Sequence, residues 1–202
     1  MPLKTKLIYL IILLAAGTLF SCSPKIISTK YYTQNKTTLD HIEQSYTKLY
    51  KQKPFLVGFT DKDFDNLSLE IITDSLTYIY DFKTTEKRLS DTLLKYDLNN
   101  AAILELIAQM RSIRCTWINN FDYYVDGEKK SSVFLSIKPV GLSGLFSNKK
   151  YYIITYFSQK QYYDKEGRLV NKRKRKQLQK LNGEVFKRIN DKVSYTVSST
   201  YR

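Results

Sequence analysis

The sequence predicts an α+β protein with a single domain, in which helices pack on one face of an antiparallel β-sheet with a meander-like second half. Apolar residues recur at helical steps in several stretches of the first half, whereas they mostly alternate with polar residues in the second half. Seventeen tyrosines and ten phenylalanines against one tryptophan are typical of half-buried strands. Four prolines and seven glycines in 202 residues exclude a collagen-like or Pro/Gly-rich disordered chain.

The N-terminal segment has the layout of an export signal. Lys4 and Lys6 precede an uncharged, mostly apolar run over residues 7–20, and a small residue and a cysteine follow. The stretch Leu19-Phe20-Ser21-Cys22 resembles the lipobox of bacterial lipoproteins, which implies cleavage before Cys22 and lipid attachment to that cysteine. An uncleaved anchor and a plain secretory signal are the alternatives. The apolar run has 14 residues, however, and a membrane-spanning helix needs about 20.

The rest of the chain is long enough for one domain. Removal of residues 1–21 leaves 181 residues, which suffice to bury a core. We expect residues 22–36 to form a polar tether and residues 37–202 a single α+β domain with a basic segment at 165–192. The whole chain carries a net charge of +14, of which only Lys4 and Lys6 lie in the predicted signal, so the remainder keeps +12.

The first half of the predicted domain alternates between helices and strands. Apolar residues at steps of three and four predict a helix over residues 38–51, which Pro54 would end. A buried strand is expected at 55–59 and a hairpin with strands at 67–71 and 76–82. Two further helices are expected, one over 85–96 and one capped by Asn99 or Asn100 that reaches about residue 110.

The second half is predicted to be mainly strands. Alternation starts at Ile113 and continues to a turn at Asp126-Gly127, a sequence that favours tight hairpins. Further strands are expected at 133–137, at 151–163, briefly at 169–170, and at 193–197. The basic stretch 172–190 fits either an amphipathic helix or a hairpin turning at Asn182-Gly183.

The basic stretch is the strongest electrostatic feature of the sequence. Residues 164–192 contain 11 basic and 4 acidic side chains. Such a run is either a solvated face or a contact with an anionic surface, and the envelope offers lipid headgroups and cell-wall polymers. The export signal argues against nucleic acid as a partner. The candidate residues for binding an anionic surface are Lys172, Arg173, Lys174, Arg175, Lys176 and Lys180.

A second candidate binding element is the connection at residues 139–149. It joins two predicted strands and contains several apolar side chains, whereas surface loops are usually polar. These residues either fold back over the end of the sheet or contact a partner protein of the envelope. The candidate partner-binding residues are Leu142, Leu145 and Phe146.

The residue types that carry catalysis or bind metals are sparse. His41 is the only histidine, and its helical position places it away from the apolar stripe. Cys115 alternates with apolar neighbours, which indicates a buried, inert thiol. Asp61, Asp63 and Asp65 begin like a calcium loop, but position six is Asn66 and position twelve is Ile72, so a solvated turn is expected. The sequence identifies no catalytic residue, cofactor or metal site.

The expected function is therefore that of a non-enzymatic envelope lipoprotein, anchored through Cys22, that binds or scaffolds another envelope component. The alternative is a hydrolase of cell-wall or glycan material that uses two paired carboxylates. Position 23 is Ser, not the aspartate that marks inner-membrane retention in enteric lipoproteins. By that resemblance, the expected location is the outer membrane, facing the periplasm.

Overall fold

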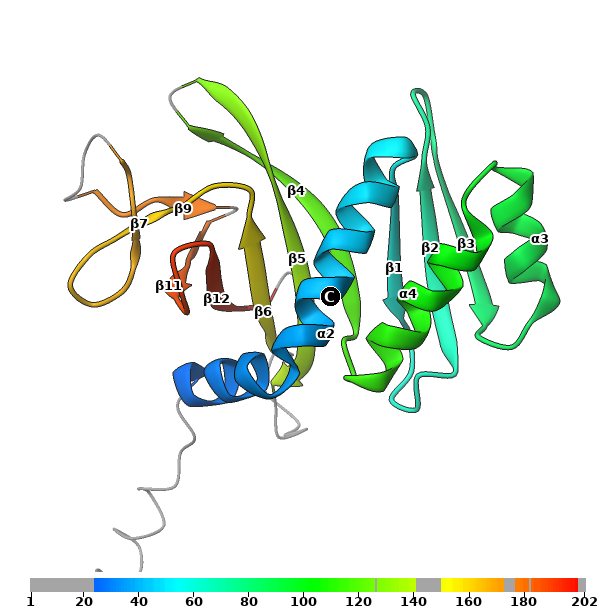
Figure 1. Ribbon diagram of the computed structural model, residues 1–202, viewed down its shortest axis with the longest axis horizontal. Helices are drawn as coiled ribbons and strands as arrows, with labels where there is room; N and C mark the ends of the chain where they lie inside the picture. Colours follow the sequence, from blue (N-terminus) through cyan, green and yellow to red (C-terminus); the bar gives the residue numbers. More distant parts are fainter. Residues whose placement is uncertain (1–23, 126, 141–149, 173–176, 182, 200–202) are drawn as a thin grey trace, which may run out of the picture.

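The predicted α+β class is confirmed by the computed structural model, which describes residues 24–125, 127–140, 150–172, 177–181 and 183–199. Three helices and an eight-stranded antiparallel sheet make up one domain (Figure 1). In chain order the elements are α2 (Pro24–Gln52), β1 (Phe55–Phe59), β2 (Asn66–Ile72), β3 (Thr77–Lys83), α3 (Lys87–Lys95), α4 (Asn100–Ser112), β4 (Trp117–Val125), β5 (Glu128–Val140), β6 (Lys150–Phe157), β7 (Tyr162–Tyr163), β8 (Leu169–Val170), β9 (Lys180–Leu181), β10 (Glu184–Val185), β11 (Lys187–Arg188) and β12 (Val193–Ser198).

The main sheet has the strand order β11-β12-β6-β5-β4-β1-β2-β3. Strands β4, β5 and β6 are consecutive neighbours, so the predicted meander is present. Val125 pairs with Glu128, which leaves a two-residue turn in which Gly127 has a φ of 84°. That left-handed backbone is open to glycine without strain, and it explains why Asp126-Gly127 favours this hairpin.

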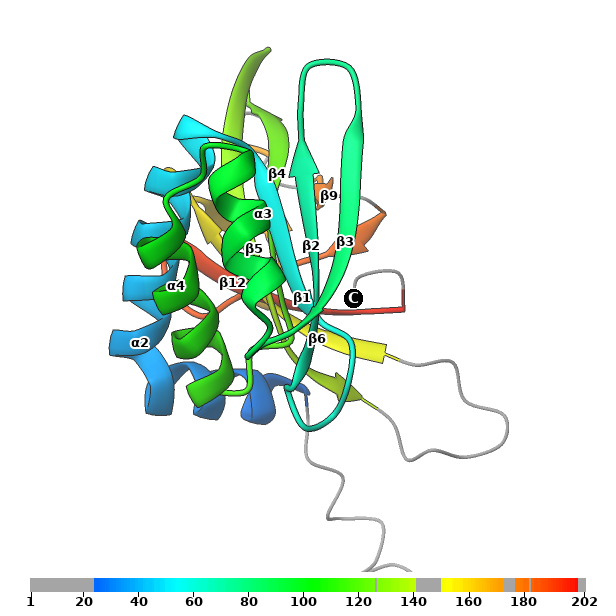
Figure 2. The ribbon, with the colours of Figure 1, turned by 90° about the vertical axis from the view of Figure 1, so that its right-hand side faces the viewer.

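The three helices cover one face of the sheet and enclose the main core (Figure 2). The apolar stripe of α2 faces the sheet, and Leu39, Ile42 and Tyr46 have no exposed surface. The Asn99 side chain accepts a hydrogen bond from the Ala102 N–H, so the predicted cap of α4 is confirmed. Buried side chains of the helices and of the sheet pack together in this layer.

The predicted tether at residues 22–36 is wrong from Pro24 onward. Helix α2 begins at Pro24, not near Thr38, and bends at Asn35, which has non-helical backbone angles. Ser28 and Tyr32 are buried one turn apart, in line with the stripe that continues at Leu39. Only a narrow stripe of the first part of α2 is buried, so most of its side chains are exposed and polar. Its composition is therefore that of a polar tether although one side of the helix packs against the domain.

Two predicted strands begin or end elsewhere. The alternation from Ile113 is not a strand: Ile113 caps α4, Arg114 has a φ of 56°, and β4 starts at Trp117. The strand predicted over 151–163 ends at Phe157, and Tyr162 and Tyr163 pair with β8 in a separate ribbon. None of the three helices in the described residues is long and apolar enough to cross a bilayer.

Candidate binding groove

The structure describes some of the predicted site residues and not others. Lys172 and Lys180 are both exposed, Lys172 two residues after β8 and Lys180 in β9. Cys22, the residues 173–176 and the loop residues Leu142, Leu145 and Phe146 lie outside the described residues. The lipid site and the apolar loop therefore stay predictions, and the basic stretch can be followed only on either side of its centre.

The described parts of the basic stretch belong to a small layer on the face of the sheet opposite the helices. Strands β7 to β10 form two short ribbons there, and Figure 2 shows β9 on the other side of the sheet from α2 and α4. The helix considered for residues 172–190 is wrong, and the hairpin alternative is correct, since Leu181 pairs with Glu184. Gly183 has a φ of 79°, the left-handed backbone that a two-residue turn requires.

A second core anchors this layer to the sheet. Leu169, Leu181 and Phe186 pack against side chains of β4, β5 and β6, and Phe186 is fully buried. The Phe157 ring meets the Phe186 ring edge-on, with centroids 6.3 Å apart. Because these side chains are buried, the short ribbons have a fixed position although each contains only two residues per strand.

Hydrogen bonds join the residues that precede the centre of the basic stretch to the residues that follow it. The Asn171 N–H donates to the Gln177 carbonyl over 3.0 Å, and the Gln179 N–H donates to the Leu169 carbonyl over 3.0 Å. Val170 and Leu178 form a β-bridge. Residues 169–171 and 177–179 are therefore fixed against each other, and Lys172 directly follows the first of these two stretches.

The basic side chains of this layer fall into two groups. Arg168 pairs with Asp164 over 2.7 Å, and Arg188 pairs with Asp191 over 2.6 Å. Among the described residues, no ion pair is found for Lys160, Lys172 or Lys180. The arginines are thus held in local contacts, whereas these lysines are exposed and can meet an external anion.

A groove of about 240 Å³ opens between the end of the β4–β5 hairpin and the β7–β8 ribbon. Val170 lies at its base and is buried, while Tyr124 and Tyr162 are large exposed aromatic side chains, 66% and 38% accessible. Lysine, glutamine and asparagine side chains supply the polar atoms. The residues that line the groove are Tyr124, Gln159, Lys160, Gln161, Tyr162, Val170, Asn171, Lys172 and Gln179.

The groove has a fixed frame on its β7 side. The Gln161 N–H donates to the Asp191 carbonyl over 2.8 Å, and its side-chain Nε2 donates to the Tyr123 hydroxyl over 3.2 Å. The Ser158 N–H donates to the Ser131 carbonyl. These bonds tie the connection between β6 and β7 to neighbouring strands, so the walls of the groove are part of the folded domain.

His41 and Cys115, the two residues considered as a catalytic base or nucleophile, are not placed for catalysis. His41 is exposed on α2, as predicted, and its Nδ1 lies 2.9 Å from the Gln109 Oε1. Cys115 has no exposed surface, and burial raises the pKa of its thiol to about 12. A thiol with that pKa is almost wholly protonated at neutral pH and is a poor nucleophile.

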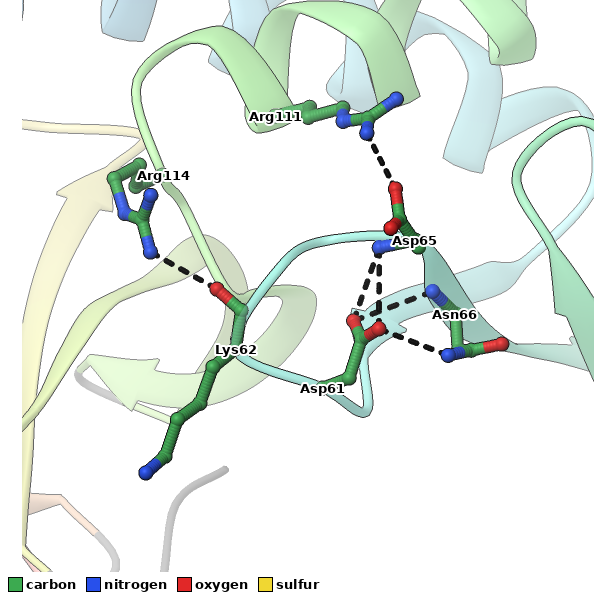
Figure 3. A network of polar contacts seen from close by, with 6 residues as sticks. All are labelled: Asp61, Lys62, Asp65, Asn66, Arg111 and Arg114. Atoms are coloured by element: carbon green, nitrogen blue, oxygen red, sulfur yellow. Dashed lines mark hydrogen bonds and ion pairs between the residues drawn. The ribbon is translucent and has the colours of Figure 1, made fainter.

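Two of the three aspartates of the β1–β2 connection, Asp61 and Asp65, take part in a network of polar contacts (Figure 3). The Asp61 carboxylate accepts hydrogen bonds from the backbone N–H groups of Asp65 and Asn66 and from the Asn66 side chain. Asp65 in turn pairs with Arg111 over 2.5 Å. The carboxylates of Asp61 and Asp65 therefore bond to the protein itself. The described residues contain no group of three or more acidic, histidine or cysteine side chains placed to hold a metal ion.

Carboxylates that could serve a hydrolase are found outside the groove. Asp40 accepts a hydrogen bond from the Tyr156 hydroxyl over 2.9 Å and pairs with Lys36, so both of its oxygens bond within the protein. A second hollow of about 200 Å³ lies between α2 and α4, and Glu105 is the one carboxylate among the described residues that line it. The aromatic and amide residues of the groove were not identified from the sequence, because they come from four separate stretches of the chain.

Comparisons of the chain with models of known protein families, with characterised proteins and with solved structures found no match.

Proposed function

We propose that the protein is a bacterial envelope lipoprotein, anchored by lipid on Cys22, whose domain binds another component of the envelope without catalysing a reaction. The observation that carries the binding role is the groove beside the basic stretch. Two exposed tyrosines, four amide side chains and two lysines line it. Exposed aromatic residues beside convergent polar groups are typical of binding sites.

The same groove favours binding over glycan hydrolysis. Hydrolysis of a glycosidic bond ordinarily requires two carboxyl groups on either side of that bond. The described residues that line the groove include no aspartate or glutamate. The buried state of Cys115 and the hydrogen-bonded surroundings of Asp40 support the same choice, since neither group is presented to a substrate.

The anchoring role is supported by the resemblance to a lipobox and by the start of the folded domain. Helix α2 begins at Pro24, two positions after Cys22, and Tyr32 in its first part is packed in the core. A lipid on Cys22 would therefore hold the domain close to the bilayer surface, without a long spacer. By resemblance to other lipoproteins, the outer membrane facing the periplasm is the proposed location.

The anchoring proposal is tested by replacing the lipid-accepting cysteine. Cells that express the Cys22→Ser variant should yield a longer, uncleaved protein that takes up no radioactive palmitate, while the unaltered protein is labelled and sediments with envelope membranes. Cys115→Ser serves as the matched control and should be labelled normally. Palmitate uptake by Cys22→Ser would contradict the proposed anchor.

A further inference from the structure

We infer that the groove formed by Tyr124, Tyr162, Lys160, Lys172 and their amide neighbours binds an acidic polysaccharide. This inference rests on the proposed envelope function and names the ligand class for it. The ligand is a chain of sugar rings that carries carboxylate or phosphate groups, the kind of polymer found at bacterial cell surfaces. The argument combines the aromatic rings, the amides and the distribution of charge.

The aromatic rings suit sugar rings. One side of a pyranose ring presents mainly C–H groups, which pack on the flat face of an aromatic side chain, and tyrosine offers that face together with a polar hydroxyl. Tyr124 and Tyr162 line the same groove from β4 and β7 and stay accessible in the folded domain. Two exposed aromatic rings that line one groove suit a flat ligand.

The amides and lysines suit the rest of such a polymer. A side-chain amide donates and accepts, so it can bond a sugar hydroxyl in either direction. Gln159, Gln161, Asn171 and Gln179 provide this chemistry, and Lys160 and Lys172 provide positive charge for acidic groups.

A lipid bilayer fits the groove less well. A membrane surface meets a broad face of a protein, whereas these tyrosines and amides line a hollow. Strand β9 directly follows Gln179, which lines the groove. Figures 1 and 2 both place β9 in the upper half of the molecule and the start of α2 toward the bottom. Because α2 begins two positions after Cys22, the groove lies away from the end that a lipid on Cys22 would hold.

The test uses a chain that begins at Ser23, since it retains every helix and strand described. Binding to polygalacturonate is measured by titration calorimetry and by migration in native gels containing the polymer, with neutral dextran as the reference. We expect binding to polygalacturonate that weakens between 0.1 M and 1 M salt, because the screening length falls from about 10 Å to about 3 Å. Dextran should bind much more weakly.

Variants separate the groove from general positive charge. Tyr162→Ala should raise the Kd about tenfold, as expected for an aromatic contact at a binding site. Tyr78→Ala is the matched control, because Tyr78 is also 38% exposed but lies on β3, and its Kd should stay within about twofold. Lys172→Gln should raise the Kd about fivefold at 0.1 M salt. Lys187→Gln makes the same charge change on β11, outside the groove, and should have little effect.

Tyr124→Ala provides a second aromatic test should Tyr162→Ala unfold, because Tyr124 is 66% exposed. Fluorescence of Trp117, the only tryptophan, reports whether each variant is folded. The inference is overturned if the folded groove variants bind polygalacturonate as tightly as the unaltered domain. Equal or tighter binding to phosphatidylglycerol vesicles or to a single-stranded oligonucleotide would also overturn it. Palmitate labelling at Cys22 is independent of all these outcomes, so a failed ligand inference is distinguishable from a failed anchor.

Discussion

Cys115 provides a quantitative test of the buried, inert thiol. Its side chain has no exposed surface, and its Sγ lies 3.5 Å from the Trp117 carbonyl oxygen. Burial raises the thiol pKa from 9.0 to about 12. At pH 8 this shift lowers the thiolate fraction about a thousandfold, before any effect of restricted access. Reaction of the native protein with a thiol reagent should therefore be at least about a thousandfold slower than reaction of the unfolded protein.

The measurement uses the chain that begins at Ser23, in which Cys115 is the only cysteine. Reaction with a coloured disulfide reagent is followed at pH 8, with and without enough urea to unfold the domain. Cys115→Ser should lower the free energy of unfolding by about 1–3 kcal/mol, because it places a hydroxyl in an apolar site. Cys115→Ala should remain the more stable of the two variants. Native labelling at the rate of the unfolded chain would refute the buried thiol and restore a nucleophilic role.

Two further predictions concern the interface between α2 and the sheet. Tyr46→Phe should lower the free energy of unfolding by about 1–2 kcal/mol in urea titrations, because the fully buried Tyr46 hydroxyl donates to the Phe55 carbonyl over 2.6 Å. The control variant Tyr124→Phe, at an exposed tyrosine, should change the free energy of unfolding by less than about 0.5 kcal/mol. Burial raises the pKa of Glu43 in the folded protein above 4.5, its ordinary value. The protonated side chain therefore stabilises the folded state fully at a pH below the pKa of the unfolded chain, and this stabilisation is lost as the pH rises through the pKa of the folded protein. The unaltered domain should then lose stability relative to Glu43→Gln between pH 4 and pH 7, and parallel stability curves would contradict the shift.

Local patterns predicted most of the first half of the domain. The alternation of Leu67, Leu69 and Ile71 places one face of β2 in the core, and all three are fully buried. The turn between β2 and β3 also lies where the sequence predicts it. The Thr73 hydroxyl closes this turn by donating to the Leu76 carbonyl. These features depend on residues close together in the sequence, whose spacing and turn chemistry are visible without the fold.

The same local patterns misled where a helix end imitates a strand. Cys115 is buried in the core and the partly buried Ile113 packs against it, which gives the alternation of a strand. The Cys115 N–H instead donates to the Met110 carbonyl, so the chain is still closing helix α4 there. Arg114 takes up the left-handed backbone between them. The spacing of apolar residues shows which side chains are buried. It does not show whether the backbone there forms the hydrogen bonds of a strand or those of a helix end.

The sequence by itself determined the α+β class, the meander and the positions of most elements. The export and lipid signal stays a prediction from the sequence. Only the tertiary structure decided that the chain packs from Pro24 onward and that β7 to β10 form two short ribbons. It alone brought Tyr124, Tyr162 and Lys172 around one groove. The physical reason is separation along the chain: helices, turns and alternation arise from neighbouring residues, whereas a groove between β4, β7 and β8 exists only once distant strands have packed.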